Sequence, residues 1–390
     1  MNAPSLGSER ARVAIGECRC CRQPGLDPVV DLGNQPVADW LVRPDAPMDA
    51  ESRYRLALVI CPSCRLLQLS PFEGEEHVRG HGHASAISST IVEHDAAWAE
   101  EMVRRLGLGS ANIVVEADEG GGGVARALGA RGARVLSPRE CPPGCADVVI
   151  ANHSLAHAAE LRLAVAKLIT PLAPGGTIAV EFHHGAKLLT DNQFDLICHA
   201  HRMYLSVAAV VKAFAHHGFR IEEAREVSVH GGSVRIYARQ DGGETGATVQ
   251  QLLATERTAG LDGVSGHRRL AREVEVISVK IRDFLAQARA DGRKVIGYGA
   301  PSRASTLLNY CGITSELLPG TVDRSTSKQG WALPGCRVPI YRPGLLAELK
   351  PDFVLVLAWT LAAEIMEQMR EVHSWGGRFV TPLPDLRVFS

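Results

Sequence analysis

Cysteine and histidine side chains are concentrated in one short stretch of this sequence. The stretch FDLICHAHRMY carries Cys198, His199 and His201 within four residues. Shortly upstream, the stretch EFHHG places His183 and His184 side by side. Imidazole titrates near neutral pH and can move protons, and imidazole and thiolate are also ligands for transition metals. The residue types therefore predict proton transfer or metal binding.

Two C-x-x-C pairs near the N-terminus predict a different kind of site. Cys18 and Cys21 form one pair, and Cys61 and Cys64 form the other about 40 residues later. Each pair can present two thiolates to one tetrahedral ion, and four thiolates complete a closed structural zinc site. A small module with little core needs such a cross-link. We expect Cys20 to be a bystander.

Composition restricts the kind of protein that must position these residues. The chain has 390 residues, 46% of them hydrophobic and 22% charged, with a formal net charge of −1. This length suits two or three domains, and the balanced charge predicts no general affinity for nucleic acid or membranes. No apolar run is long enough to span a bilayer, and the first residues lack a secretory pattern. We expect a cytoplasmic protein with reduced thiols; its oligomeric state is left open.

The hydrophobic pattern predicts an α/β protein in four parts. A zinc-binding module is expected over residues 1–72 and an α/β domain with alternating strands and helices over 73–246. A helical connection follows over 247–291, and a second α/β unit occupies 292–390. In such sheets ligands bind at the carboxyl ends of the strands.

The glycine-rich turn NIVVEADEGGGG follows the first strand of the middle domain. It offers a cofactor-binding turn at Glu116, Gly120, Gly121 and Gly122. A second turn, GYGAP, follows a strand of the C-terminal unit and is suited to holding an anion at the next helix.

Several motifs together resemble one enzyme family. They are the two cysteine pairs, QFDLICHAHRMYLSV, VHGGSVRIY, GYGAPSRASTLLNYCG, VDRSTSKQG and KPDFVLVLAW. The chain resembles, over nearly its whole length, the C-methyltransferases that methylate carbon 3 of a dTDP-linked 4-keto sugar with S-adenosylmethionine (SAM). The resemblance implies a zinc-binding module, a class I methyltransferase-like Rossmann domain and a C-terminal Rossmann-like domain. It also implies a small-molecule substrate such as a dTDP-sugar, with His201 as the base.

The active-site segments depart from the family pattern. Cys198 stands where the family has tyrosine, and Ala200 replaces a glutamate. Histidines replace a tyrosine pair of the family at His81 and His83 and a Pro-Tyr pair at His183 and His184. These residues, with His199 and His201, form the candidate catalytic set. Three interpretations stay open: an acid–base pocket, a second metal site, and drift in an inactive pocket.

The SAM-binding segments depart further. Asp118 stands at the first glycine of the family turn, and Ser137 stands where an acid would hold the ribose. The connection from Arg139 to the next strand lacks roughly thirty residues that carry a helix and a strand around the adenine in the family. We therefore expect a SAM-independent enzyme that removes a proton alpha to a carbonyl, followed by epimerisation, isomerisation or elimination. The alternatives are a SAM-dependent C-methyltransferase and a non-catalytic relative that binds a sugar nucleotide.

Overall fold

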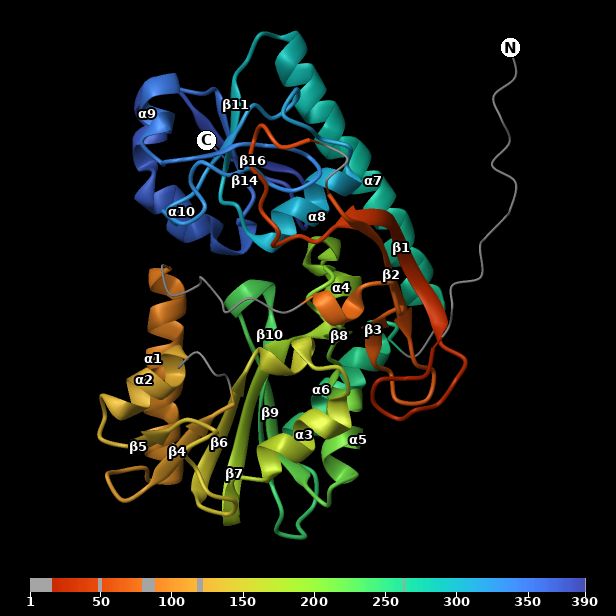
Figure 1. The fold of residues 1–390 in the computed structure, drawn as a ribbon, viewed down its shortest axis with the longest axis vertical. Helices are drawn as coiled ribbons and strands as arrows, with labels where there is room; N and C mark the ends of the chain where they lie inside the picture. Colours follow the sequence, from red (N-terminus) through yellow and green to blue (C-terminus); the bar gives the residue numbers. More distant parts are fainter. Residues whose placement is uncertain (1–15, 48–50, 79–87, 118–121, 262–263, 390) are drawn as a thin grey trace.

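Three β-sheets organise the chain in a computed structural model that describes residues 16–47, 51–78, 88–117, 122–261 and 264–389. The middle α/β domain lies below the C-terminal one in Figure 1, and the N-terminal sheet lies beside the junction of the two. The predicted α/β class with an N-terminal cysteine module is confirmed. No helix of these described residues has the length and apolar character of a membrane span.

The N-terminal sheet borrows a strand from the histidine-rich stretch. Its strands are β1 (Asp27–Pro36), β2 (Arg53–Ile60), β3 (Leu67–Leu69) and β8 (Met203–Tyr204), in that order and all antiparallel. Leu67 pairs with Tyr204, and Gln68 pairs with Met203. The cysteine module is therefore continuous with the segment that begins at Cys198.

The middle sheet has the strand order β5-β4-β6-β7-β10-β9. Its strands are β4 (Ile113–Glu116), β5 (Arg134–Leu136), β6 (Ala146–Asn152), β7 (Leu172–His183), β9 (Arg220–Val227) and β10 (Ser233–Arg239). The first four run parallel, and β10 is antiparallel to both β7 and β9. The carboxyl ends of β4, β6 and β7 therefore meet at one edge, where an α/β sheet binds its ligands.

Helices cover both faces of the middle sheet. They are α1 (Ser89–Leu106), α2 (Gly123–Gly129), α3 (Leu161–Ile169), α5 (Val207–Ala215) and α6 (Ala247–Thr258). The short helix α4 (Gly185–Thr190), which follows β7, instead packs into the core that contains residues of the N-terminal sheet and the C-terminal domain. Trp98 of α1 is completely buried on one face, against Val114 of β4 and Tyr237 of β10. On the other face, Val165 of α3 and Phe214 of α5 belong to a second apolar core.

The C-terminal sheet has the order β13-β12-β11-β14-β15-β16. Its strands are β11 (Val295–Tyr298), β12 (Thr321–Val322), β13 (Ile340–Tyr341), β14 (Phe353–Val356), β15 (Arg378–Thr381) and β16 (Arg387–Phe389), and only β16 pairs antiparallel. Its helices are α8 (Ser302–Tyr310), α9 (Leu345–Leu349) and α10 (Ala362–Gln368). This arrangement agrees with the expected Rossmann-like unit.

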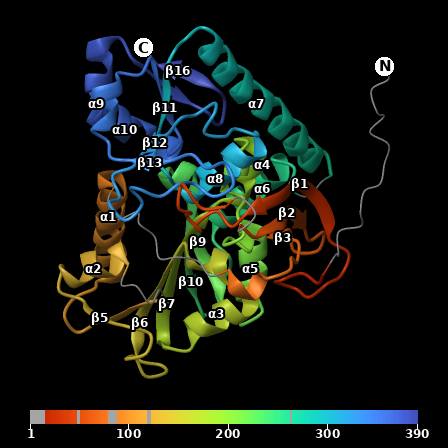
Figure 2. The same cartoon turned by 45° about the horizontal axis from the view of Figure 1, so that its top comes forward.

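The predicted helical connection consists of two helices with separate roles. The first, α6, packs on β9, while α7 (Val264–Ala290) runs along one side of the molecule beside β1 and reaches the C-terminal domain (Figures 1 and 2). Leu270, Ile281 and Leu285 of α7 are buried in a core that also contains residues of the N-terminal sheet and the C-terminal domain. The helix α7 therefore joins these two parts.

The C-terminal domain also caps a helix of the middle domain. The carboxylate of Glu364 in α10 accepts hydrogen bonds from the Ser88 hydroxyl at 2.7 Å and from the Thr90 backbone N–H at 3.1 Å. Burial alone would raise the pKa of Glu364, but these hydrogen bonds lower it to about 2. An anion at a helix N-terminus is stabilising, so this contact fixes α1 relative to the C-terminal domain.

Candidate active site

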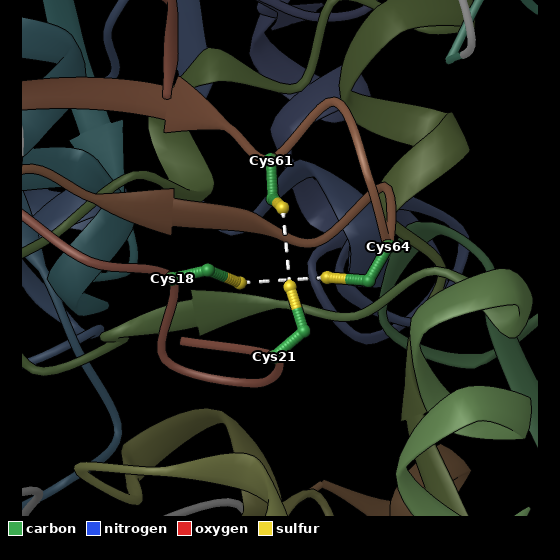
Figure 3. A group of neighbouring side chains, drawn as sticks. All are labelled: Cys18, Cys21, Cys61 and Cys64. Carbon is green, nitrogen blue, oxygen red and sulfur yellow. Dashed lines mark hydrogen bonds between the residues drawn. The ribbon is translucent and has the colours of Figure 1, made fainter. Parts of the chain in front are cut away.

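The four cysteines of the two pairs converge on one point, as Figure 3 shows. Their sulfur atoms all lie within 4.8 Å of one another. The Cys18–Cys64 sulfurs are 3.4 Å apart, and the Cys21–Cys61 sulfurs are 3.5 Å apart. Thiolates at about 2.3 Å around a tetrahedral zinc ion would lie roughly 3.8 Å apart. The group fits a closed structural zinc site, where zinc would cross-link the module and perform no chemistry.

The two cysteine pairs share the same local geometry. The residue after each pair, Arg22 or Arg65, has a left-handed φ of 62° or 63° and donates its N–H to the carbonyl of Cys18 or Cys61. This turn aims both sulfurs of a pair to the same side. Cys20 is buried but directs its sulfur to the carbonyl of Ala209, which confirms that it lies outside the group.

Hydrogen bonds connect the cysteine module to the histidine-rich stretch. Leu69 N–H donates to the carbonyl of Arg202 at 3.0 Å, and the Ser206 hydroxyl donates to the carbonyl of Arg65 at 3.0 Å. The Arg202 guanidinium in turn binds the carbonyl of Glu75 at 2.9 Å. The position of His201 therefore depends on the module that the cysteines hold together.

Five histidines gather at the carboxyl ends of β6 and β7. They are His153, His157, His183, His201 and His230. Ring centroids are 4.5 Å apart for His153 and His183, 5.9 Å for His183 and His201, and 4.9 Å for His157 and His201. A small cavity lies among them, lined by His153, Ala156, Phe182, His183, Leu196, His201, Met203, Tyr204 and Leu205.

The tautomer of His201 follows from its hydrogen bond. Its Nδ1 lies 3.3 Å from the carbonyl oxygen of Leu196, and because a carbonyl only accepts, Nδ1 carries the proton. In the neutral ring, Nε2 then carries the lone pair that a general base needs. His157 follows the same rule, since its Nδ1 donates to the carbonyl of Ala200 at 2.8 Å.

Burial controls the charge on His183. It places the pKa of His183 well below the ordinary value, and the neighbouring His153, His230 and His201 add to this effect. The imidazole is therefore neutral at neutral pH.

A buried carboxylate stands behind the histidines. Glu181 of β7 lies 2.7 Å from His94 Nε2 and 3.5 Å from His153 Nε2, while Arg235 of β10 binds its other oxygen at 2.8 Å. Burial alone would raise the pKa of Glu181, but the hydrogen bonds from His153 and His94 and the charge of Arg235 hold it well below its usual range. The carboxylate is thus a fixed negative charge beside the cluster.

The other predicted histidines lie apart from the cluster. The side chain of His184 is completely buried between Glu226 and Glu256, with nitrogen–oxygen distances of 3.2 and 3.0 Å. His199 donates through Nε2 to the carbonyl of Tyr54 at 3.2 Å and packs against Phe72. His81 and His83 lie outside the described residues.

Cys198 is buried in a small apolar cluster with Val37, Ala38 and Val78. Burial, with a further effect of Asp39, raises its pKa to about 12. The side chain is therefore a neutral thiol at neutral pH and not a thiolate nucleophile or ligand.

Three members of the cluster, His153, His157 and His230, were not singled out from the sequence as site residues. His153 directly follows the buried strand β6, and His157 comes one helical turn later. His230 lies in the VHGGS segment between β9 and β10. The signal that identifies them is their position after strand ends that meet at the ligand-binding edge.

The glycine-rich turn is only partly described, and Gly120 and Gly121 lie outside that part. Glu116 accepts the N–H of Ala125 at 3.0 Å and so caps the start of α2, which Gly122 precedes. A Cβ on Gly123 would come within 1.9 Å of the Asp95 carboxylate, so Asp95 fills the space in front of this turn. Burial raises the pKa of Asp95.

The connection after β5 is short and contains no strand in its described residues, 137–145. β5 is consequently an edge strand of the sheet. The position at its end is Ser137, but the carboxylate of Glu140, three residues later, accepts hydrogen bonds from Ser137 N at 2.9 Å and Ser137 Oγ at 2.7 Å. The expectation of reduced thiols is wrong here, since Cys141 and Cys145 form a disulfide in this connection.

A class I methyltransferase-like sheet, a cysteine-rich module and a second Rossmann-like domain define the class of protein. Residues 228–384 match a family model described as "C-methyltransferase C-terminal domain", and residues 18–78 match one described as a "zinc binding domain". C-methyltransferase NovU of Streptomyces niveus is 30% identical over 408 aligned residues, which cover 96% of this chain and 97% of NovU. This chain belongs to the C-methyltransferase family.

Two solved methyltransferases are also similar to this chain. Magnesium protoporphyrin IX methyltransferase of Synechocystis is 14% identical, with a TM-score of 0.32, over 42% of this chain and 91% of its own. The 1,6-didemethyltoxoflavin-N1-methyltransferase of Burkholderia thailandensis is 15% identical, with a TM-score of 0.31, over 40% of this chain and 80% of its own.

We expect one tightly bound zinc ion per chain, and we expect Cys61→Ser to lose most of it, because three thiolates no longer close the site. Since the module carries β3, amide hydrogen exchange at Met203 and Tyr204 should accelerate, while exchange in β11 and β14 should not change. Cys20→Ser is the matched control and should retain zinc. Unchanged zinc content and unchanged melting of Cys61→Ser would contradict the assignment.

His199 should make the protein sensitive to mild acid. Burial lowers its pKa to about 4 from an ordinary 6.5, so its neutral form stabilises the fold above pH 6.5 and this contribution is lost as the pH falls through 4. Between pH 7 and pH 5 the loss should be about 2 kcal/mol in the free energy of unfolding. Urea unfolding at both pH values measures it. His199→Gln retains a donor for Tyr54, and in this variant the change in the free energy of unfolding between the two pH values should be smaller by about 2 kcal/mol. If the change is equal in both proteins, His199 is not its cause.

Proposed function

We propose that this protein removes a proton alpha to the carbonyl of a nucleotide-linked keto sugar or a related natural-product intermediate, and that it does so without methyl transfer from SAM. The observation that carries the proposal is the placement of His201. Its Nδ1 is held by a backbone carbonyl, its ring lines the small cavity, and its Nε2 has the lone pair. These are the requirements for a general base.

The proposed reaction begins when His201 Nε2 takes the proton. The electron pair of the broken C–H bond forms the carbon–carbon double bond of an enolate, and the negative charge moves to the former carbonyl oxygen. Returning the proton to the other face gives epimerisation, and returning it to another carbon gives isomerisation. Loss of a leaving group from the next carbon gives elimination. His183 is the candidate for carbonyl polarisation or reprotonation, because it lines the same cavity.

Charged groups from the C-terminal domain lie beside this site. Arg303 of α8 is 3.8 Å from Asp195, and Trp359 donates its indole N–H to Asp195 at 2.7 Å. The side chains of Arg303 and Asp195 are only 10% and 1% exposed, and burial lowers the pKa of Arg303 and raises that of Asp195. Among the described residues, Arg303 Nη1 has no hydrogen-bond partner and lies 3.8 Å from Asp195, so Arg303 is a candidate anchor for an anionic substrate group.

The residues around the glycine-rich turn do not fit SAM well. Asp95 fills the space in front of Gly123, and the turns at 137–145 provide no wall for an adenine beyond β5. We therefore assign no step of the reaction to SAM.

A SAM-dependent C-methyltransferase is the second candidate. Family membership favours it, and so does the carboxylate of Glu140, which Ser137 holds at the end of β5, where an acid can bind ribose hydroxyls. In that case the same enolate would be formed by His201, and only its fate would differ.

Solvent deuterium exchange at the carbon alpha to the ketone tests the role of His201. We expect wild-type protein to exchange this proton on a dTDP-4-keto sugar, and His201→Gln to slow exchange by about a hundred- to ten-thousand-fold. Cys198→Ala should stay within a few-fold of wild type, whereas Cys198→Tyr should lose activity because a phenol overfills the apolar cluster. His216→Gln, at an exposed position, is the control. If His201→Gln exchanged the proton at the wild-type rate, His201 would not be the base.

A further inference from the structure

Three of the clustered imidazoles, those of His153, His183 and His230, are in mutual contact. His153 follows β6, His183 ends β7, and His230 lies in the loop before β10. The ring centroids are 4.5 Å apart for His153 and His183, 4.7 Å for His153 and His230, and 5.4 Å for His183 and His230. Three elements that are distant in sequence thus bring three nitrogen ligands together.

The hydrogen bonding of two of these rings is incomplete. His153 is 6% exposed, and within the part of the chain that the structure describes its Nδ1 has no hydrogen-bond partner, nor has the enclosed Nε2 of His183, while Nε2 of His153 lies 3.5 Å from Glu181. A buried polar nitrogen without a partner is costly, and such groups in folded proteins commonly face an ion or a water molecule. These nitrogens therefore point to a missing ligand.

The backbone holds two of the rings in an uncommon conformation. His153 has a φ of 56° and His230 a φ of 57°, both in the left-handed region that few residues other than glycine adopt. Residues held in this way are concentrated at functional sites. The ring of His153 also has a carboxylate behind it, because Glu181 lies 3.5 Å from its Nε2. A carboxylate behind a histidine is the usual support of a metal-binding imidazole.

The spacing of the rings suits a single metal ion. With nitrogens at about 2.0–2.1 Å from a tetrahedral ion, imidazole centroids would lie roughly 5 Å apart. The observed separations of 4.5–5.4 Å agree with this value. As the rings are turned here, their nitrogens do not converge, and among the described residues only the four cysteines form a converged group. Rotation about the Cβ–Cγ bond, a soft torsion, reorients an imidazole without moving the backbone.

We propose that His153, His183 and His230 bind a second divalent metal ion of the zinc class, separate from the four-cysteine site. Imidazole ligands favour zinc or cobalt over magnesium or calcium, and three protein ligands leave one position open. Two of these ligands, His153 and His183, line the same cavity as His201. Resting on the proposed function, the ion would hold the carbonyl oxygen and stabilise the enolate charge while His201 takes the proton.

Titration with Co²⁺ tests the site without a substrate. Metal-depleted full-length protein should bind two cobalt ions per chain. The four-thiolate site gives strong sulfur charge-transfer absorption, and the histidine site gives weaker visible bands without it. His183→Gln and His153→Gln should each lose the second ion and its bands but keep the thiolate signal, which also reports that the protein is folded. His216→Gln should bind both ions.

Two results would overturn the second metal site. One is a single cobalt ion per chain with thiolate absorption only, at cobalt in large excess. The other is a second ion that remains bound in both His183→Gln and His153→Gln. The exchange reaction is measured separately: if these variants lose the second ion but keep exchange, the metal site stands, its role in the reaction is refuted, and His201 remains the base.

Discussion

The pairing of β3 with β8 is the constraint on which the histidine cluster depends. The strand β8 begins two residues after His201, and its partner β3 begins three residues after Cys64. A three-residue strand and a two-residue strand have little stability of their own. The four-cysteine group fixes the turn beside β3, and the hydrogen bonds from Leu69 to Arg202 and from Ser206 to Arg65 hold the segment that contains His201 against it. The four-cysteine group thus supports the strand whose residues Met203 and Tyr204 line the cavity.

Buried charges set the electrostatics around this cavity. The Glu181 carboxylate is compensated by Arg235, and the Asp195 carboxylate lies near Arg303 of the C-terminal domain. Removing one partner of such a pair leaves an uncompensated charge, which is strongly destabilising. The histidines between these pairs are crowded, and burial keeps His183 neutral. The site can therefore accept a proton or a metal ion but is poorly suited to hold several imidazolium charges.

Features that depend on local residue spacing or on long hydrophobic patterns could be predicted from the sequence. The two C-x-x-C pairs predicted the four-cysteine group, because two residues between cysteines suffice to aim both sulfurs to one side. Alternating strands and helices predicted the α/β domains. Neighbouring histidines were harder, because successive side chains at the end of an extended strand point to opposite sides. His183 therefore lines the cavity while His184 is buried between Glu226 and Glu256.

Features that form only when the chain or a side chain folds back on itself could not be predicted from the sequence. His153 and His230 are 77 residues apart in sequence and meet only because β6, β7 and β10 are adjacent in the sheet. Glu140 lies three residues beyond the expected acid position, and its side chain turns back to Ser137. The disulfide between Cys141 and Cys145 depends on the turn between them, which thiol spacing alone does not define.

We propose that this protein has lost the wall that would bind the adenine of SAM but has kept His201 as a base. One labelling experiment tests both parts of this proposal. The protein is incubated in D₂O with a dTDP-4-keto sugar and SAM that carries a deuterated methyl group, and the sugar nucleotide is analysed by mass spectrometry. If His201 forms the enolate without SAM, the sugar gains solvent deuterium at the carbon alpha to the ketone and no labelled methyl group. A product that carries the labelled methyl group on that carbon would contradict it and establish methyl transfer.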